Sequence, residues 1–164
     1  MANLLSEISE DFLIRVMAFE KALQERTTDY SYMIYMDEYE DGEVFYIGQF
    51  STTRMGVRTC VRITEFDTHM LAEGIDNEWI LNLNQPQKFV EVLNGLSEFK
   101  YAGIKIAKED CWDEDEVAVN LEYHLPVVDE YCCDTEGYAQ MILEAFTLFK
   151  AEVFMFDQKF KSIE

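Results

Sequence analysis

Apolar residues recur at three- and four-residue steps near the start of the chain and again near its end. This spacing predicts two amphipathic helices, because it places the apolar side chains on one face. Acidic residues open the first stretch, as is typical of a helix N-terminus, and Ser6 is its expected N-cap. The first stripe consists of Leu5, Ile8, Phe12, Val16, Phe19 and Leu23. The last helix is expected to begin at Asp134 or Thr135, and its stripe consists of Tyr138, Ile142, Ala145, Phe149, Val153, Phe156 and Phe160.

Three segments rich in aromatic and β-branched residues follow the first helix and predict strands. They are "YSYMIYM", "VFYIGQF" and "VRTCVRITEF". Both faces of the first segment are nearly apolar, which is typical of a well-buried strand. Asp41-Gly42 between the first two segments is a strong hairpin signal. In the third segment, Arg58, Cys60 and Arg62 share one face of the strand.

The second half of the chain predicts a helix and a second hairpin. Residues 67–78 are expected to be irregular, and "WILNLN" to form at most a short strand. Pro86 suits the first position of a helix that runs to about Glu98. The segments "KYAGIKIA" and "EVAVNLEYHL" then pair as antiparallel strands, since the latter alternates strictly between apolar and polar residues. The prediction is one α+β domain over residues 1–164, with an antiparallel sheet of about five strands in the order α-βββ-α-ββ-α.

Charge narrows the range of partners. The chain of 164 residues carries a formal net charge of −20, which repels nucleic-acid phosphates and anionic membranes and favours basic partners. We therefore expect neither direct nucleic-acid binding nor membrane binding. A secretion signal and an apolar run of about 20 residues are not recognisable, so a cytoplasmic location is expected. Charge alone also leaves open an acidic inhibitor, or DNA mimic, that binds a basic site on a nucleic-acid-binding protein.

The acid run in "EDCWDEDE" raises the question of a metal site. A calcium loop would need alternating oxygen ligands, a central glycine and flanking helices, and this run has none of them. It lies between two strands that are expected to pair, so we interpret it as a solvated hairpin tip. Neither zinc spacing nor a CxxC pair can be built from the cysteines, which are expected to be reduced thiols. They are Cys60, Cys111, Cys132 and Cys133. No metal and no cofactor are expected.

The chain lacks every catalytic motif that we could recognise. No GxSxG, GxGxxG, P-loop or HExxH occurs. His69 and His124 are the only histidines, and His124 is expected on the solvent face of its strand as an ordinary surface residue. No catalytic residues are therefore predicted, and a non-enzymatic role is expected.

Two groups of side chains are candidates for binding a partner. Arg54, Arg58 and Arg62 stand out in so acidic a chain, and they either pair with carboxylates across the sheet or form a binding strip. Tyr32 and Tyr35 belong to an aromatic-rich set that is either core or an exposed strip for a partner segment or second subunit. The five residues form the predicted partner-binding set.

The segment "NQPQKFVEVLNGLSEFKYAGIKIAKEDCWDEDEVAVNLEYHLPVVDEYCCDTEGYAQMILEAFTLF" and the order of elements resemble the YbjN family of bacterial sensory transduction regulators. The resemblance rests on Asn94, Phe99, the strand ending "LEYHLPV" and a last helix carrying "EAFTLF". The longer acidic tip and residues 67–78 depart from the family pattern. The resemblance implies the fold of the class I type III secretion chaperones and a homodimer that binds protein segments. The expected function is thus a chaperone-like or regulatory protein-binding module.

Overall fold

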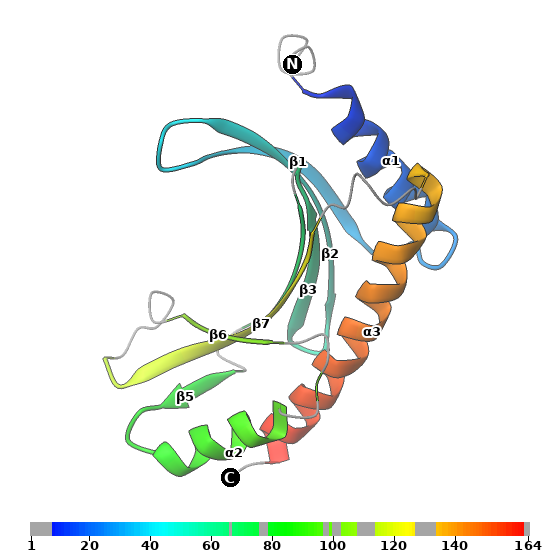
Figure 1. Cartoon of the computed structure of the whole chain (residues 1–164). Coiled ribbons are helices and arrows are strands. Elements are labelled where there is room, and N and C mark those ends of the chain that lie inside the picture. Colours follow the sequence, from blue (N-terminus) through cyan, green and yellow to red (C-terminus); the bar gives the residue numbers. More distant parts are fainter. Residues whose placement is uncertain are drawn as a thin grey trace. The chain divides into compact units, whose positions relative to one another are not determined.

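The computed structural model describes residues 8–65, 67–75, 79–96, 99, 103–107, 114–126 and 134–162. In this part of the chain, the elements follow in the order α-βββββ-α-ββ-α, so the protein is α+β as predicted (Figure 1). The helices are α1 (Glu10–Gln24), α2 (Pro86–Leu96) and α3 (Thr135–Ser162). The strands are β1 (Ser31–Glu38), β2 (Val44–Arg54), β3 (Val57–Ile63), β4 (Asp67–Gly74), β5 (Ile80–Asn82), β6 (Gly103–Ala107) and β7 (Glu116–Pro126).

The strands belong to one hydrogen-bonded sheet. Its path is β1-β2-β3-β4-β7-β5, and β6 also pairs with β7. β1 and β2 are antiparallel, with Tyr35 opposite Ile47, and both β5 and β6 are antiparallel to β7. β6 and β7 pair, as predicted for the two segments that flank the acid run. Of the acids in this run, Glu114 and Asp115 are exposed in a turn and Glu116 begins β7, whereas Glu109, Asp110 and Asp113 lie outside the described residues.

The sheet has seven strands in the described part of the chain, where about five were predicted. One additional strand is β5, within "WILNLN". The other is β4, in the stretch expected to be irregular, so that expectation was wrong. Thr68, Met70 and Ala72 are fully buried there and alternate with less buried neighbours, which is the period of a strand. Because two of these buried positions are a threonine and an alanine, the alternation between hydrophobic and polar residues is weak in the sequence.

β1 is exposed along most of its length, although its two apolar faces predicted a well-buried strand. Six of its eight residues are exposed, and Met33 and Met36 are 52% and 55% exposed. The physical reason is position, because β1 ends the path of the sheet and, among the described strands, pairs only with β2. An apolar composition therefore marks exposed apolar surface here rather than core.

The residues at which the helices begin are those that can cap a helix N-terminus or suit its first turn. The expected cap Ser6 lies outside the described residues, and the cap of α1 is Ser9, whose Oγ accepts a hydrogen bond from the backbone N–H of Phe12 at 3.4 Å. α2 begins at Pro86 as predicted. α3 begins at Thr135, and Asp134 Oδ1 accepts from the N–H of Gly137 at 2.7 Å.

None of the helices in the described ranges combines the length and apolar character needed to cross a membrane.

Packing divides the chain into two compact units. The first comprises residues 1–52, 60–69 and 124–146, and the second comprises residues 53–59, 70–123 and 147–164. β2, β3, β4, β7 and α3 each contribute residues to both units. The prediction of a single domain over residues 1–164 stays a prediction.

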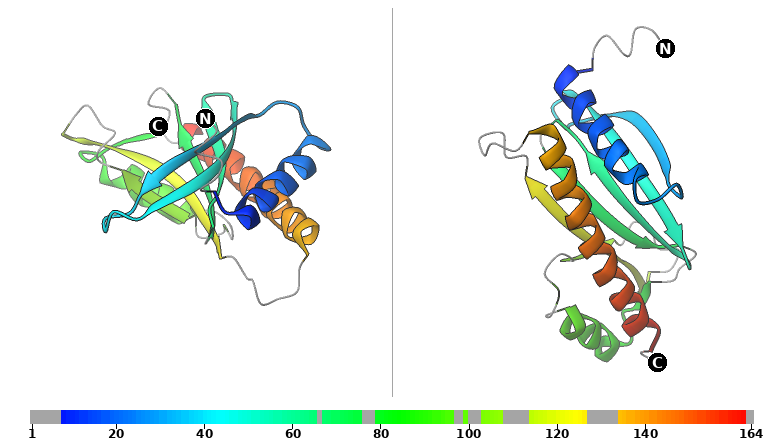
Figure 2. Two further views of the ribbon diagram at one scale, coloured as in Figure 1. Left: turned by 90° about the horizontal axis from the view of Figure 1, so that it is seen from above. Right: turned by 90° about the vertical axis from the view of Figure 1, so that its right-hand side faces the viewer.

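In the first unit, α1 and the N-terminal half of α3 lie side by side on one face of the strands (Figure 2). Phe19 of α1 packs edge-on against Phe50 of β2, with ring centroids 4.9 Å apart. Gly48 of β2 lies so close to α1 that a Cβ there would be 2.8 Å from a methyl carbon of Val16. Among the described elements of this unit, the opposite face of the strands carries no helix (Figure 1).

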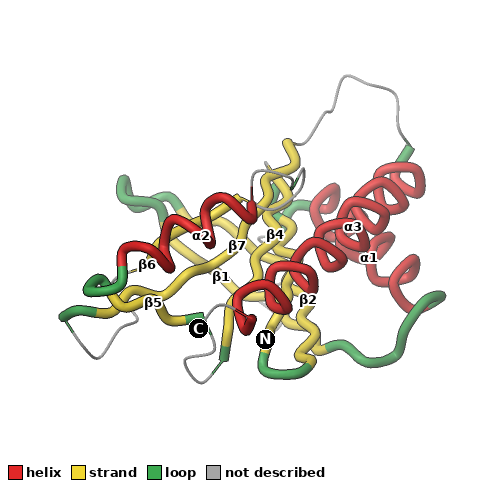
Figure 3. The backbone as a smooth tube through the Cα atoms, turned by 90° about the horizontal axis from the view of Figure 1, so that it is seen from below, coloured by secondary structure: helices red, strands yellow, loops and turns green. Residues whose placement is uncertain are grey.

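In the second unit, α2 follows β5 and contacts it (Figure 3). The buried Trp79, next to β5, packs edge-on against Phe156 of α3, with ring centroids 4.9 Å apart. The same indole donates a hydrogen bond from Nε1 to Oδ1 of Asp157 at 3.0 Å. The predicted stripe on α3 is buried throughout, which confirms that this helix forms core with its apolar face.

Candidate functional site

The predicted partner-binding residues do not form one surface. Tyr32 stacks on Phe50, with centroids 4.8 Å apart, so it lies on the helix-covered face of β1. Tyr35, an odd number of positions later, projects from the opposite, uncovered face. Arg58 forms an ion pair with Glu73, and Arg54 is exposed at the end of β2. The alternative that the arginines pair with carboxylates therefore holds for Arg58.

Tyr35 and Arg62 do come together, through a residue that sequence reasoning missed. Gln49 Oε1 accepts one hydrogen bond from Tyr35 Oη at 3.2 Å and another from Arg62 Nε at 2.9 Å. Gln49 Nε2 in turn donates to Ser51 Oγ at 3.1 Å. Burial raises the pKa of the Tyr35 hydroxyl, and the charge of Arg62 offsets part of that rise. The uncovered face of β1 and β2 thus carries the hydrogen-bonded side chains of Tyr35, Gln49 and Ser51 beside the exposed Met33.

Cys60 is a buried thiol, with 1% of its surface exposed. It is the one cysteine within the described residues, because Cys111, Cys132 and Cys133 lie outside them. A buried thiol in β3 is a small apolar residue rather than a nucleophile.

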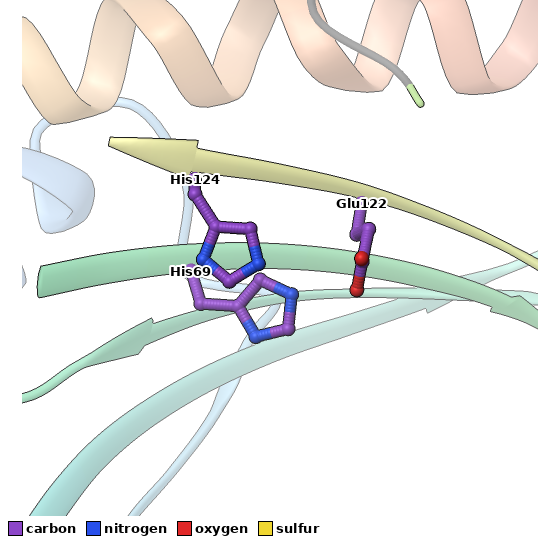
Figure 4. Close-up of side chains that lie close together, drawn as sticks. All are labelled: His69, Glu122 and His124. Atoms are coloured by element: carbon purple, nitrogen blue, oxygen red, sulfur yellow. The ribbon is translucent and has the colours of Figure 1, made fainter. Parts of the chain in front are cut away.

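The two histidines meet across the sheet. β4 and β7 are hydrogen-bonded neighbours, and the rings of His69 and His124 stack with centroids 4.1 Å apart and an angle of 4° between their planes (Figure 4). Glu122 precedes His124 by two residues on β7, so strand alternation places it on the same face. One ligand atom from each of these three residues lies within 4.8 Å of the others.

This face of β4 points away from α3. Thr68, between Asp67 and His69, hydrogen-bonds to Tyr138 of α3, with the two hydroxyl oxygens 2.9 Å apart. His69 therefore projects from the other face of the strand. The side chain of His124 is 57% exposed, as predicted for the solvent face of its strand. Solvent or a small ion can reach this histidine directly.

Asp67 is held beside the histidine pair by a tight turn. The backbone N–H of Asp67 donates to Thr64 Oγ1 at 3.0 Å, and that hydroxyl donates to Asp67 Oδ1 at 2.9 Å. The second carboxylate oxygen, Oδ2, lies 3.7 Å from Nδ1 of His124. The carboxylate is thus oriented toward one particular nitrogen of one histidine.

The histidine pair was not predicted, because residues 67–78 were interpreted as irregular. Without β4, His69 had no assigned neighbour and Glu122 had no partner beyond its own strand. The available signal was the alternation of Thr68, Met70 and Ala72 with Asp67 and His69.

Comparison of the chain with protein-family models, with curated proteins and with solved structures finds no match. The resemblance to the YbjN family therefore stays a prediction.

Proposed function

We propose that the protein is a cytoplasmic, non-enzymatic protein-binding module, chaperone-like or regulatory, which acts as a homodimer with a secretion-chaperone-like fold. The observation that carries the proposal is the exposed edge strand β1. An edge strand presents unpaired backbone N–H and C=O groups, which can hydrogen-bond to another strand. Natural proteins commonly protect such an edge with charge, proline or a bulge. From Ser31 to Met36, β1 has none of the charged residues or prolines that do so.

The sequence of β1 is complementary to itself. In a twofold-symmetric antiparallel pair centred on Ile34, Tyr32 lies opposite Met36 and Met33 lies opposite Tyr35. Each exposed methionine then meets a tyrosine ring, and contacts between a thioether and an aromatic ring are favourable. Because a twofold axis repeats the contact, both methionines of each copy are covered.

Charge favours the same arrangement. The acidic end of β1 consists of Asp37 and Glu38, and antiparallel pairing centred on Ile34 places them opposite Ser31 and Tyr30. A parallel in-register pair would instead place acids opposite acids, which is destabilising. The occupant of the β1 edge in this proposal is therefore a second copy of the chain.

The segment bound by the dimer is expected to be basic with apolar anchors. A surface with a net charge of −20 attracts positively charged partners over long range. Exposed tyrosine and methionine side chains suit apolar anchors on such a segment. Tyr39 and Val44, which are 42% and 50% exposed and lie outside the Tyr32–Met36 stretch that pairs in the dimer, offer such contacts.

Light scattering over a range of micromolar concentrations tests the homodimer. The wild type is expected to be dimeric, and Met33→Lys is expected to be monomeric because it places a charge in the pairing strand. Met17→Lys, at an exposed methionine of α1, is the matched control and should remain dimeric. A wild type that is monomeric throughout, or a Met33→Lys variant as dimeric as the control, contradicts the dimer.

Binding of fluorescent peptides tests the function separately. A basic amphipathic peptide should bind, whereas an acidic peptide of the same apolar content should not. Binding held by apolar contacts should survive as added salt shortens the Debye length from about 10 Å to about 3 Å. Complete loss over that range would favour the acidic inhibitor instead, and no binding of the basic peptide would refute the function.

A further inference from the structure

We propose that His69, Glu122 and His124 form a binding site for a zinc-class transition-metal ion. Two imidazoles and one carboxylate are a ligand set suited to Zn²⁺ and its first-row neighbours, whereas Ca²⁺ and Mg²⁺ prefer oxygen ligands alone. The site is independent of the β1 edge and does not require the dimer.

The separations of the donor atoms fit one ion. At metal–ligand bonds of about 2.0–2.2 Å, donors in a tetrahedral site lie about 3.3 Å from one another. The three donor atoms lie within 4.8 Å of one another, and rotation of the side chains can bring them to the shorter separation. The two rings are stacked face to face, so binding requires each ring to turn a nitrogen toward a common centre. The exposure of His124 leaves room for that rotation.

The backbone already holds the three ligands in position. His69 and His124 lie on paired strands, and Glu122 is fixed to His124 by the period of β7. A site built on strands loses less conformational freedom on binding than one built on loops. Three ligands leave the fourth tetrahedral position for water, as in zinc sites that keep an open coordination position.

Asp67 provides a second, independent observation that points to a metal. Histidine ligands typically donate their other ring N–H to a carboxylate, which fixes the tautomer and strengthens the ligand. Asp67 Oδ2 lies 3.7 Å from Nδ1 of His124, and Thr64 orients this carboxylate. This arrangement leaves Nε2 of His124 as the metal-binding nitrogen. The large negative charge of the chain further raises the local concentration of cations.

The test uses the chain of 164 residues, stripped of metal by a chelator and then titrated with ZnCl₂ in a calorimeter. One high-affinity site per chain is expected. His69→Ala and His124→Ala are expected to weaken zinc binding at least tenfold, and Glu122→Gln should weaken it as well. Asp67→Asn, which removes only the supporting carboxylate, is expected to cost about tenfold. Glu144→Gln is the matched control, because it removes the same charge at an exposed position on α3.

Titration with Co²⁺ tests the coordination directly. A visible absorption band of four-coordinate Co²⁺ is expected in the wild type and absent in both histidine variants. Circular dichroism checks that the variants are folded, since His124 is exposed but His69 and Glu122 are half-buried. Zinc binding in the histidine variants as tight as in Glu144→Gln would overturn the proposal and leave an ordinary cross-strand histidine pair. A thiolate-to-cobalt band would overturn it too, because it assigns the metal to cysteine.

Discussion

Replacement of Trp79 by phenylalanine removes the hydrogen bond between the indole and Asp157 while keeping an aromatic ring in the core. Trp79 and Asp157 are 1% and 3% exposed, so neither group can turn to bulk water when its partner is lost. The carboxylate would retain its ion pair with Lys161, whose Nζ lies 3.1 Å from Oδ2. Oδ1 would lose the indole donor seen in the structure.

The expected magnitude has two parts. A hydrogen bond to a charged group contributes about 1.5–3 kcal/mol, and a buried acceptor left without a donor pays its desolvation cost. The smaller ring also leaves part of the indole volume empty against Phe156, which adds a fraction of the roughly 3–5 kcal/mol for complete removal of an aromatic ring. We therefore expect Trp79→Phe to lower the free energy of unfolding by about 2–4 kcal/mol, a large share of the total for one domain.

A double-mutant cycle separates the hydrogen bond from the packing. Asp157→Asn keeps an oxygen that can accept from the indole but removes the charge of that acceptor and the ion pair with the partly exposed Lys161, so it should cost about 1–2 kcal/mol. Asp157→Leu removes the acceptor. The coupling energy between Trp79→Phe and Asp157→Leu should reach about 1–3 kcal/mol.

Urea denaturation followed by far-ultraviolet circular dichroism measures these values without depending on tryptophan fluorescence. The linear dependence of the unfolding free energy on urea gives each stability. A Trp79→Phe variant within about 0.5 kcal/mol of the wild type, the range of ordinary surface changes, would refute the reasoning. So would additive effects of Trp79→Phe and Asp157→Leu.

Two further predictions concern the first unit. Gly48→Ala places a Cβ 2.8 Å from a methyl carbon of Val16, so it should lower the free energy of unfolding, measured in urea, by about 1–3 kcal/mol. In a Val16→Ala background the same change should be neutral or stabilising. An equal cost in both backgrounds would contradict this. Burial raises the pKa of the Tyr138 hydroxyl above its usual value of 10.0, although the hydrogen bond with Thr68 acts in the opposite direction. Because the folded-state pKa is the higher one, the stability from the neutral hydroxyl is present below pH 10 and is lost as the pH rises through the folded pKa. Tyr138→Phe should therefore lose less stability than the wild type above about pH 10, and identical pH profiles would exclude this role.

Local patterns were sufficient for most elements but not for their neighbours in the sheet. The stripes on α1 and α3 were predictable because a period of 3.6 residues repeated over many turns is a strong signal. Burial of β1 was mispredicted because apolar composition does not distinguish a central strand from an edge strand. Position within the sheet depends on long-range pairing, which a single segment does not encode.

The candidate metal site was missed for a related reason. β4 uses a threonine at a buried position, and the hydrogen bond between Thr68 and Tyr138 stabilises that choice only once α3 has packed. His69 and His124 are 55 positions apart in the sequence, and only the pairing of β4 with β7 brings them together. Chemistry that depends on strand pairing is not visible in residue spacing.

The burial of Cys60 has a kinetic consequence. Its thiol is 1% exposed in β3, a strand with neighbours on both sides, so a thiol reagent can modify it only during moments when the sheet opens locally. When reclosing is faster than modification, the labelling rate relative to that of a free thiol gives the population of the open state. Mass analysis of the peptide containing Cys60 therefore measures the population of the locally opened state of β3 in the native protein, without any denaturant.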